Sequence, residues 1–160
     1  RIDETADPEL SIERALETYL RKGNSKEWIN QRLKTIEVRN ELTDEWDHRG
    51  VQKGLEYAIL TDEITKAWAG LSTREYKNLK GLKKESLRDN MTNLELVLNM
   101  LAEASTTEIS KEKEPETFEE NKAVARQGGL VANAAKNQLE ETTGKKVVTS
   151  KNADEIKRLR

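Results

Sequence analysis

The residues of this sequence best suited to bind a charged partner are six cations between positions 71 and 88. They are Arg74, Lys77, Lys80, Lys83, Lys84 and Arg88. Only Glu75 and Glu85 oppose them in this segment, whereas the whole chain of 160 residues carries a formal net charge of −2. Clustered lysine and arginine side chains neutralise phosphates and make binding sensitive to salt. The segment therefore predicts a surface for DNA or for a protein partner, and the alternative is that the cations only face water.

Residues that could perform catalysis are scarce. His48 is the only histidine, and the chain contains no cysteine. Asp44 lies one helical turn before His48, but these two side chains alone make a poor zinc site. The sequence has no glycine-rich phosphate loop, and its carboxylates alternate with lysines as on a solvated helix surface. We therefore expect no enzymatic activity, cofactor or metal, and we expect His48 to lie exposed near a helix end.

The composition predicts exposed helices around a thin core. Apolar residues make up 34% of the chain and charged residues 36%, whereas an apolar share of about 45–50% including glycine is usual. This balance favours an elongated all-α molecule over a compact globule. No apolar run approaches the roughly 18 residues of a membrane span, and the lack of cysteine is typical of a reducing compartment. We therefore expect a cytoplasmic protein with no membrane partner.

Helix-capping signals organise the first third of the chain. Asp7-Pro8 is typical of a helix start, and the cations before Gly23 are typical of its end. Ser25 then caps a long helix that runs to about Arg49-Gly50. We expect these two helices to form an N-terminal hairpin.

An apolar run at residues 57–60 predicts either a short buried strand or an extended linker. Thr61, which follows it, is predicted to cap a short helix over residues 62–69. Gly70 separates this helix from a second one over residues 73–79.

A short helix, a glycine and a second short helix resemble a helix-turn-helix, in which the second helix reads DNA. Lys66 departs from that pattern, because its position normally holds a small residue. The alternative is a plain helical hairpin with Trp68 and Tyr76 in the core.

The clearest helix start in the sequence is Thr92, which has the spacing of a capping box with Glu95. The apolar residues that follow at helical spacing are Leu94, Val97, Leu98, Leu101 and Ala102. Such a stripe indicates either core or a partner-binding face, and we favour core. Asn99 and Glu103 fall on the other side of this helix.

The last long helix follows a charged connector at residues 110–116. It is predicted to start with a second capping box at Thr117 and to end at Gly144. Small residues follow one another inside it at Ala125, Gly128, Gly129, Ala132 and Ala135. Glycine within a helix costs about 1 kcal/mol relative to alanine. We therefore expect either close helix packing or a kink at the two glycines. Together with the thin core, the small residues predict that the chain buries further surface in a homo-oligomer.

These elements predict an all-α fold in two parts. Residues 1–110 form a helical domain that includes a basic hairpin at 61–90. Residues 111–160 form a C-terminal helical segment, packed on the first part or on a partner chain, with a final helix up to Arg160. Residues 57–60 and 147–149 are the candidates for one short β element.

A set of short motifs extends over roughly residues 30–156. The longer ones are Arg39-Asn40-Glu41-Leu42, Tyr57-Ala58-Ile59-Leu60-Thr61, Lys80-Gly81-Leu82-Lys83-Lys84 and Leu87-x-Asp89-x-Met91. The shorter ones are Gly50-Val51, Gly70-Leu71, Tyr76-Lys77, Glu95-Leu96, Thr106-Thr107, Thr143-Gly144 and Asn152-Ala153. As a set, these motifs resemble the C-terminal half of the bacterial DNA-damage-inducible protein D family and related phage proteins of the BRO/antirepressor type.

That family carries a BRO-type N-terminal domain, which this sequence does not show. Because the chain begins with Arg1 rather than methionine, we expect it to be part of a longer product. The resemblance implies a non-enzymatic accessory protein of the bacterial DNA-damage response that modulates recombinase–single-stranded DNA filaments by protein contact. The alternative is a phage-type antirepressor or transcriptional regulator whose helices oligomerise or capture a repressor.

Overall fold

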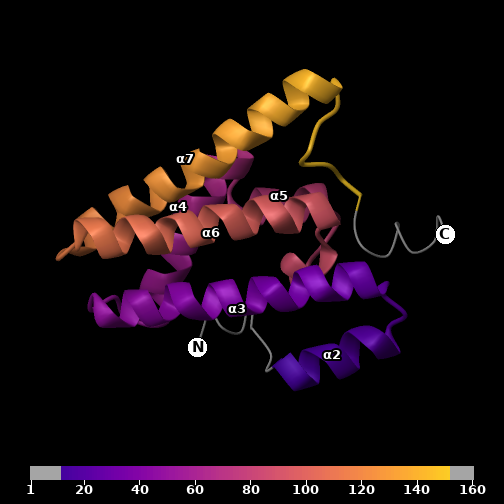
Figure 1. Cartoon of the computed structure of the whole chain (residues 1–160), viewed down its shortest axis with the longest axis horizontal. Helices are drawn as coiled ribbons and strands as arrows, with labels where there is room; N and C mark the ends of the chain where they lie inside the picture. Colours follow the sequence, from indigo (N-terminus) through magenta and orange to yellow (C-terminus); the bar gives the residue numbers. More distant parts are fainter. Residues whose placement is uncertain (1–11, 152–160) are drawn as a thin grey trace.

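The computed structural model describes residues 12–151, which form helices and their connections (Figure 1). The helices are α2 (Ile12–Arg21), α3 (Lys26–His48), α4 (Leu55–Ala69), α5 (Thr73–Leu79), the 3-10 turn η1 (Arg88–Asn90), α6 (Asn93–Lys113) and α7 (Phe118–Thr143). No strand occurs between residues 12 and 151, so the predicted all-α fold class is confirmed. The predicted helix start at Asp7-Pro8 and the predicted final helix lie outside the described residues.

Side-chain caps begin the longer helices where the sequence predicts. The Thr92 hydroxyl accepts from the backbone N–H of Glu95, whose carboxylate accepts from the N–H of Thr92 in return. Thr117 also caps α7 through the N–H of Glu120 (3.1 Å). The second half of that predicted capping box is different, because the Glu120 carboxylate accepts from the N–H of Glu116 instead (2.7 Å).

The strand or linker predicted at residues 57–60 is wrong. These residues lie in the first turns of α4, which begins after Gly54 (φ 91°). Thr61 is therefore inside the helix, and its hydroxyl donates to the carbonyl of Tyr57 (2.7 Å) instead of capping a helix. The run is helical because Tyr57, Leu60 and Ile64 fall on one buried side of α4. Residues 147–149 form no strand either.

The helices pack in layers. α6 lies between α3 and α7, and α7 also packs on α4 (Figure 1). Aromatic rings fill the interior, with the Trp46 and Tyr57 ring centroids 5.2 Å apart between α3 and α4. The predicted domain boundary at residue 110 falls inside α6, and α7 packs directly on helices of the first part. No described helix combines the length and the apolar character needed to cross a membrane.

Two glycines allow α7 to cross α6 and α4 closely. A Cβ atom at Gly128 would lie 2.7 Å from the backbone nitrogen of Thr106 on α6. A Cβ atom at Gly129 would lie 2.5 Å from the Cβ of Ala67 on α4. Ala125 and Ala132 are fully buried nearby, and Ala135 is partly buried. Because α7 continues unbroken through both glycines, this packing offsets their low helix propensity, and the break considered from sequence does not occur.

Candidate interaction surface

The structure separates the six cations of residues 71–88 into a buried pair and a surface group. Lys80 is 4% exposed and Arg88 is 3% exposed. A phosphate outside the protein cannot reach a side chain buried to that extent, so both residues are removed from the predicted binding surface. Arg74, Lys83 and Lys84 are exposed, and Lys77 is half-buried.

Lys80 is the centre of the first buried charge cluster. Its ammonium lies 2.7 Å from Glu95 Oε1 on α6 and donates to the carbonyls of Thr149 (2.9 Å) and Lys151. The hydroxyl of Tyr76 donates to the other Glu95 oxygen. Burial, reinforced by the negative charge of Glu95, raises the pKa of Tyr76 far above its usual range. The phenol therefore stays protonated as a donor. The cluster ties α5 and the segment after α7, which includes Thr149 and Lys151, to α6.

Arg88 belongs to a second buried cluster. Its Nη2 lies 2.7 Å from Glu103 Oε2, and Arg39 Nη1 lies 3.0 Å from the same oxygen. Arg39 Nη2 also donates to the hydroxyl of Thr61 (2.8 Å). Glu103 is 1% exposed, so its charge requires cationic partners in the interior. The cluster joins α3, α4, η1 and α6.

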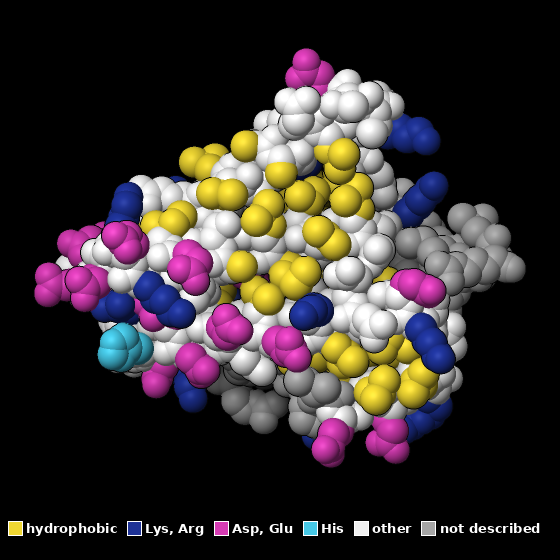
Figure 2. Space-filling model, in the orientation of Figure 1, with side chains coloured by type: hydrophobic (Ala, Val, Ile, Leu, Met, Phe, Trp, Pro, Cys, Tyr) yellow, Lys and Arg dark blue, Asp and Glu magenta, His cyan; other side chains and the backbone are white. Residues whose placement is uncertain are grey.

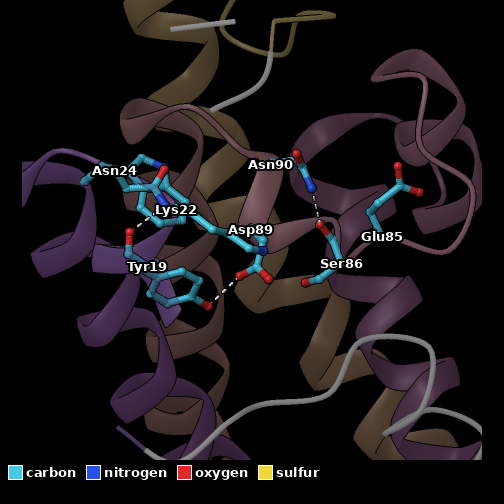
Figure 3. A pocket seen from close by; sticks show the side chains of 8 residues that line it. Tyr19, Lys22, Asn24, Glu85, Ser86, Asp89 and Asn90 are labelled. Carbon is cyan, nitrogen blue, oxygen red and sulfur yellow. Dashed lines mark hydrogen bonds between the residues drawn. The ribbon is translucent and has the colours of Figure 1, made fainter. Parts of the chain in front are cut away.

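The next residue along the chain, Asp89, holds the N-terminal helices in place. Its Oδ1 accepts from the hydroxyl of Tyr19 (2.5 Å) and from Arg32 Nε (2.9 Å). An open cavity of about 410 Å³ lies beside this contact, between the α2–α3 turn and the segment around Ser86 and Asn90 (Figure 3). Asp89 points towards Tyr19 in this view, and its carboxylate is already occupied by structural bonds. The carboxylate of Asp89 is therefore a structural group at the edge of this cavity.

The four cations outside the interior share their surface with two carboxylates. Backbone N–H groups of Lys83 and its neighbours, with Lys77 nearby, lower the pKa of Glu85. Glu85 therefore stays ionised among the cations and reduces their attraction for phosphate. Glu75 is held by the backbone N–H of Ser72 in the α5 capping box.

The second helix of the predicted helix-turn-helix is anchored in the core. Tyr76 on α5 is fully buried, and its ring packs edge-on against Trp68 of α4 with the centroids 6.1 Å apart. This is the arrangement that the helical-hairpin alternative predicts. His48, the residue first considered for catalysis, is exposed at the end of α3 as expected. The described residues contain no group of three side chains arranged to hold a metal ion.

The orientation of α6 is the main difference from the prediction. Leu94 is 42% exposed and Leu101 is 37% exposed, although the apolar stripe is predicted to be core. Leu98 and Ala102 are buried, but the opposite side with Asn99 and Glu103 is buried as well. The cause is the charge clusters, because Lys80, Arg88 and Arg39 bind the carboxylates of α6 inside the protein.

Because α6 is oriented with Glu95 and Glu103 inside, some of its apolar side chains lie on the surface where α6 and α7 are side by side. We define the α6–α7 face as Leu94, Val97 and Leu101 of α6 with Val131 and Ala134 of α7. Val131 is 43% exposed and Ala134 is also exposed, whereas Val97 is half-buried. Figure 2 shows hydrophobic side chains gathered over these two helices in the middle of the view.

One sequence signal could have revealed this orientation. Glu95, Asn99 and Glu103 follow one another at intervals of four residues, and Ser110 lies two turns further on the same side. Glu95 is assigned by its spacing to a capping box, which is usually solvated, so its second role as the partner of Lys80 is not visible in one sequence. The pairing of Glu45 with Ser110 (2.7 Å) was also missed, because it joins residues 65 positions apart.

No family model, curated protein or solved structure matches this chain. The resemblance to the DNA-damage-inducible protein D family therefore stays a prediction. Several residues of the motifs that carry it, including Tyr76, Lys80 and Glu95, belong to the buried clusters. The resemblance thus concerns residues that determine the fold more than residues of the exposed face.

Proposed function

We propose that this protein is a non-enzymatic accessory protein that acts by binding another protein through the α6–α7 face. The observation that carries the proposal is the exposure of Leu94 and Leu101 on α6, whose carboxylates Glu95 and Glu103 are buried and paired with cations instead. Contiguous apolar surface on a soluble domain commonly marks a site of interaction.

The partner that we propose is a recombinase assembled on single-stranded DNA, in the bacterial DNA-damage response. The support for this choice is the family resemblance of the sequence motifs. A phage-type repressor is the alternative partner for the same face. In both cases the chain acts by contact and needs no catalytic group.

Direct DNA contact is a second candidate function, supported by the exposed cations Arg74, Lys83 and Lys84. Binding through so few phosphate contacts would be weak and would fall steeply with salt. The carboxylates of Glu75 and Glu85 on the same surface reduce it further. We therefore give protein contact the larger role.

The test uses a bacterial recombinase assembled on a dye-labelled single-stranded oligonucleotide, with fluorescence polarisation as the measure of filament loss. The native chain is expected to change the rate of filament loss. A Leu94→Gln/Leu101→Gln variant should need about tenfold more protein for the same effect. Leu55→Gln is the matched control, because Leu55 is also exposed but lies at the start of α4. The proposal fails if the native chain has no effect on filaments or if the double variant acts like the control.

A further inference from the structure

We propose that the α6–α7 face binds an amphipathic helix of a partner protein that carries a short apolar stripe flanked by lysine or arginine. This inference rests on the proposed function and specifies the chemistry of the partner. Its starting point is the spacing of Leu94, Val97 and Leu101, which form a straight ridge along two turns of α6. Val131 and Ala134 are exposed on α7, which packs beside α6, and Figure 2 shows hydrophobic side chains over both helices.

The α6–α7 face has the size needed to bind a single helix of a partner. Amphipathic helices dock on apolar surfaces through residues at positions i, i+3, i+4 and i+7. The ridge on α6 has the matching length, because Leu94 and Leu101 are seven residues apart. A stable interface between two globular proteins takes roughly 800 Å² from each partner, which is far more than these few side chains supply.

The charges around the α6–α7 face determine which sign of charge the partner helix should carry. Beyond Leu101, the same side of α6 continues as Glu108 and Glu112, both exposed. The connector adds the exposed carboxylates of Glu114 and Glu116, and the first turn of α7 adds those of Glu119 and Glu120. The last turn of α6 carries the exposed lysines Lys111 and Lys113 at the same end. Figure 2 shows acidic side chains gathered at the end of the molecule where α6 meets α7. Cations on the bound helix would therefore be attracted to this end.

The exposed α3 residues strengthen the same preference. Glu37, Glu41 and Asp44 are exposed on α3, with Lys34 as the exposed cation among them. In Figure 2, several acidic side chains lie over α3 below the central hydrophobic side chains, with Lys or Arg side chains among them. This negative charge would repel DNA phosphates, so nucleic acid is not the ligand of the α6–α7 face.

A second copy of this chain would bring a carboxylate against a leucine when two α6 helices meet at Leu101. In a two-fold symmetric contact the same surface meets itself. If two copies of α6 met in antiparallel fashion at Leu101, Glu108 of one copy would lie against Leu94 of the other. Covering a carboxylate with an apolar side chain removes its water without supplying a cation, which is costly.

The experiment uses three dye-labelled synthetic helical peptides and the full chain, with binding measured by fluorescence polarisation. The first peptide has leucines at i, i+3 and i+7 and lysines in the flanking turns. The second has glutamate in place of each lysine, and the third has glutamine in place of each leucine. The lysine–leucine peptide is expected to bind at least about tenfold more tightly than either of the others. Equal binding of the lysine and glutamate peptides, or no binding of any peptide, would overturn the proposal.

Variants of the chain locate the contact. Leu94→Gln/Leu101→Gln should weaken binding of the lysine–leucine peptide about tenfold, and Leu55→Gln should leave it unchanged. Glu108→Gln/Glu112→Gln should weaken it by about threefold at low salt and should reduce its salt dependence. An equal loss in the Leu55 control would show that the peptide binds elsewhere and would contradict the assignment.

Two further outcomes keep this inference separate from the proposed function. If the native chain changes filament loss but binds no peptide, the proposed function stands and the basic-helix partner is wrong. If light scattering shows a dimer that Leu94→Gln/Leu101→Gln disrupts, the face belongs to a second copy, and the inference is overturned.

Discussion

The two sides of α6 differ sharply in the side chains that they bury and expose. Towards the interior, Glu95, Asn99 and Glu103 are buried, and both carboxylates are in contact with lysine or arginine. Towards the solvent, Leu94 and Leu101 lie exposed beside α7. A helix of a soluble protein normally has the opposite arrangement, with leucines inside and carboxylates outside.

The contrast teaches that charge contributes to how α6 is oriented, because Glu95 and Glu103 are buried on the helix together with apolar side chains such as Leu96. Glu95 attracts Lys80 and thereby the C-terminal segment, while Glu103 attracts Arg39 and Arg88 from two other elements. Buried ion pairs add little net stability, but removing one partner is costly, because the remaining charge is left in the interior. The inner side therefore determines the arrangement of the helices, and the outer side is left available for a partner.

The largest effect is expected from removing the ion pair between Lys80 and Glu95 on the buried side of α6. Lys80→Ala leaves Glu95 without its cation in a buried site, so the free energy of unfolding should fall by about 3–5 kcal/mol. Urea denaturation followed by far-ultraviolet circular dichroism measures this change. Lys83→Ala/Lys84→Ala is the control, because these side chains are exposed and should change stability by less than about 0.5 kcal/mol. Similar effects of the two variants would show that Lys80 is not a structural cation.

A smaller effect is expected at the crossing of α6 and α7. Gly128→Ala places a Cβ atom against the backbone of Thr106, and such overpacking typically costs about 1–3 kcal/mol. The reverse substitution at an exposed position of α7, Ala123→Gly, is the control, because it should destabilise α7 by about 1 kcal/mol through helix propensity alone. Thermal unfolding of both variants compares them. A stabilising effect of Gly128→Ala would contradict the close crossing.

The smallest effect concerns the segment after α7 at low pH. Glu140 accepts from the backbone N–H of Val147 (2.9 Å), which, with Lys136 and Lys146 nearby, lowers the pKa of Glu140. A lowered pKa in the folded state stabilises this contact above the usual glutamate range, and the stabilisation is lost as the pH falls through the folded value. The amide signal of Val147 in an NMR titration should therefore change at a pH below about 4.3, the usual glutamate pKa.

Glu140→Gln should remove this titration from the Val147 signal, because glutamine does not ionise. A midpoint at the ordinary glutamate pKa in the native chain would show that the contact with Val147 does not form in solution.

Most helix limits could be predicted from the sequence, since they depend on local chemistry. The predicted caps at Ser25, Thr92 and Thr117 act on backbone groups three residues away. The failure at residues 57–60 has a local cause as well. Four consecutive apolar residues carry no periodicity of their own, and the buried side of α4 becomes visible only with Ile64 and Trp68.

The orientation of α6 and the roles of the cations could not be predicted, because they depend on distant pairs. Arg39 and Glu103 are 64 residues apart in sequence, and nothing near either residue indicates the other. Lys80 looks like its neighbours Lys83 and Lys84 in the sequence, although it alone of the three is buried. A count of the cations in a segment therefore overestimates the positive charge on the surface when buried carboxylates bind some of them.

The most direct test compares two residues on opposite sides of α6, Leu101 and Glu103, by urea denaturation of Leu101→Gln and Glu103→Gln. Glu103→Gln leaves Arg39 and Arg88 without a carboxylate, so the free energy of unfolding of this variant should fall by about 3 kcal/mol or more. Leu101→Gln changes an exposed leucine, so the free energy of unfolding of this variant should fall by less than about 1 kcal/mol. If Leu101→Gln is the more destabilising of the two, the leucine side of α6 is core, and the α6–α7 face is not a surface for a partner.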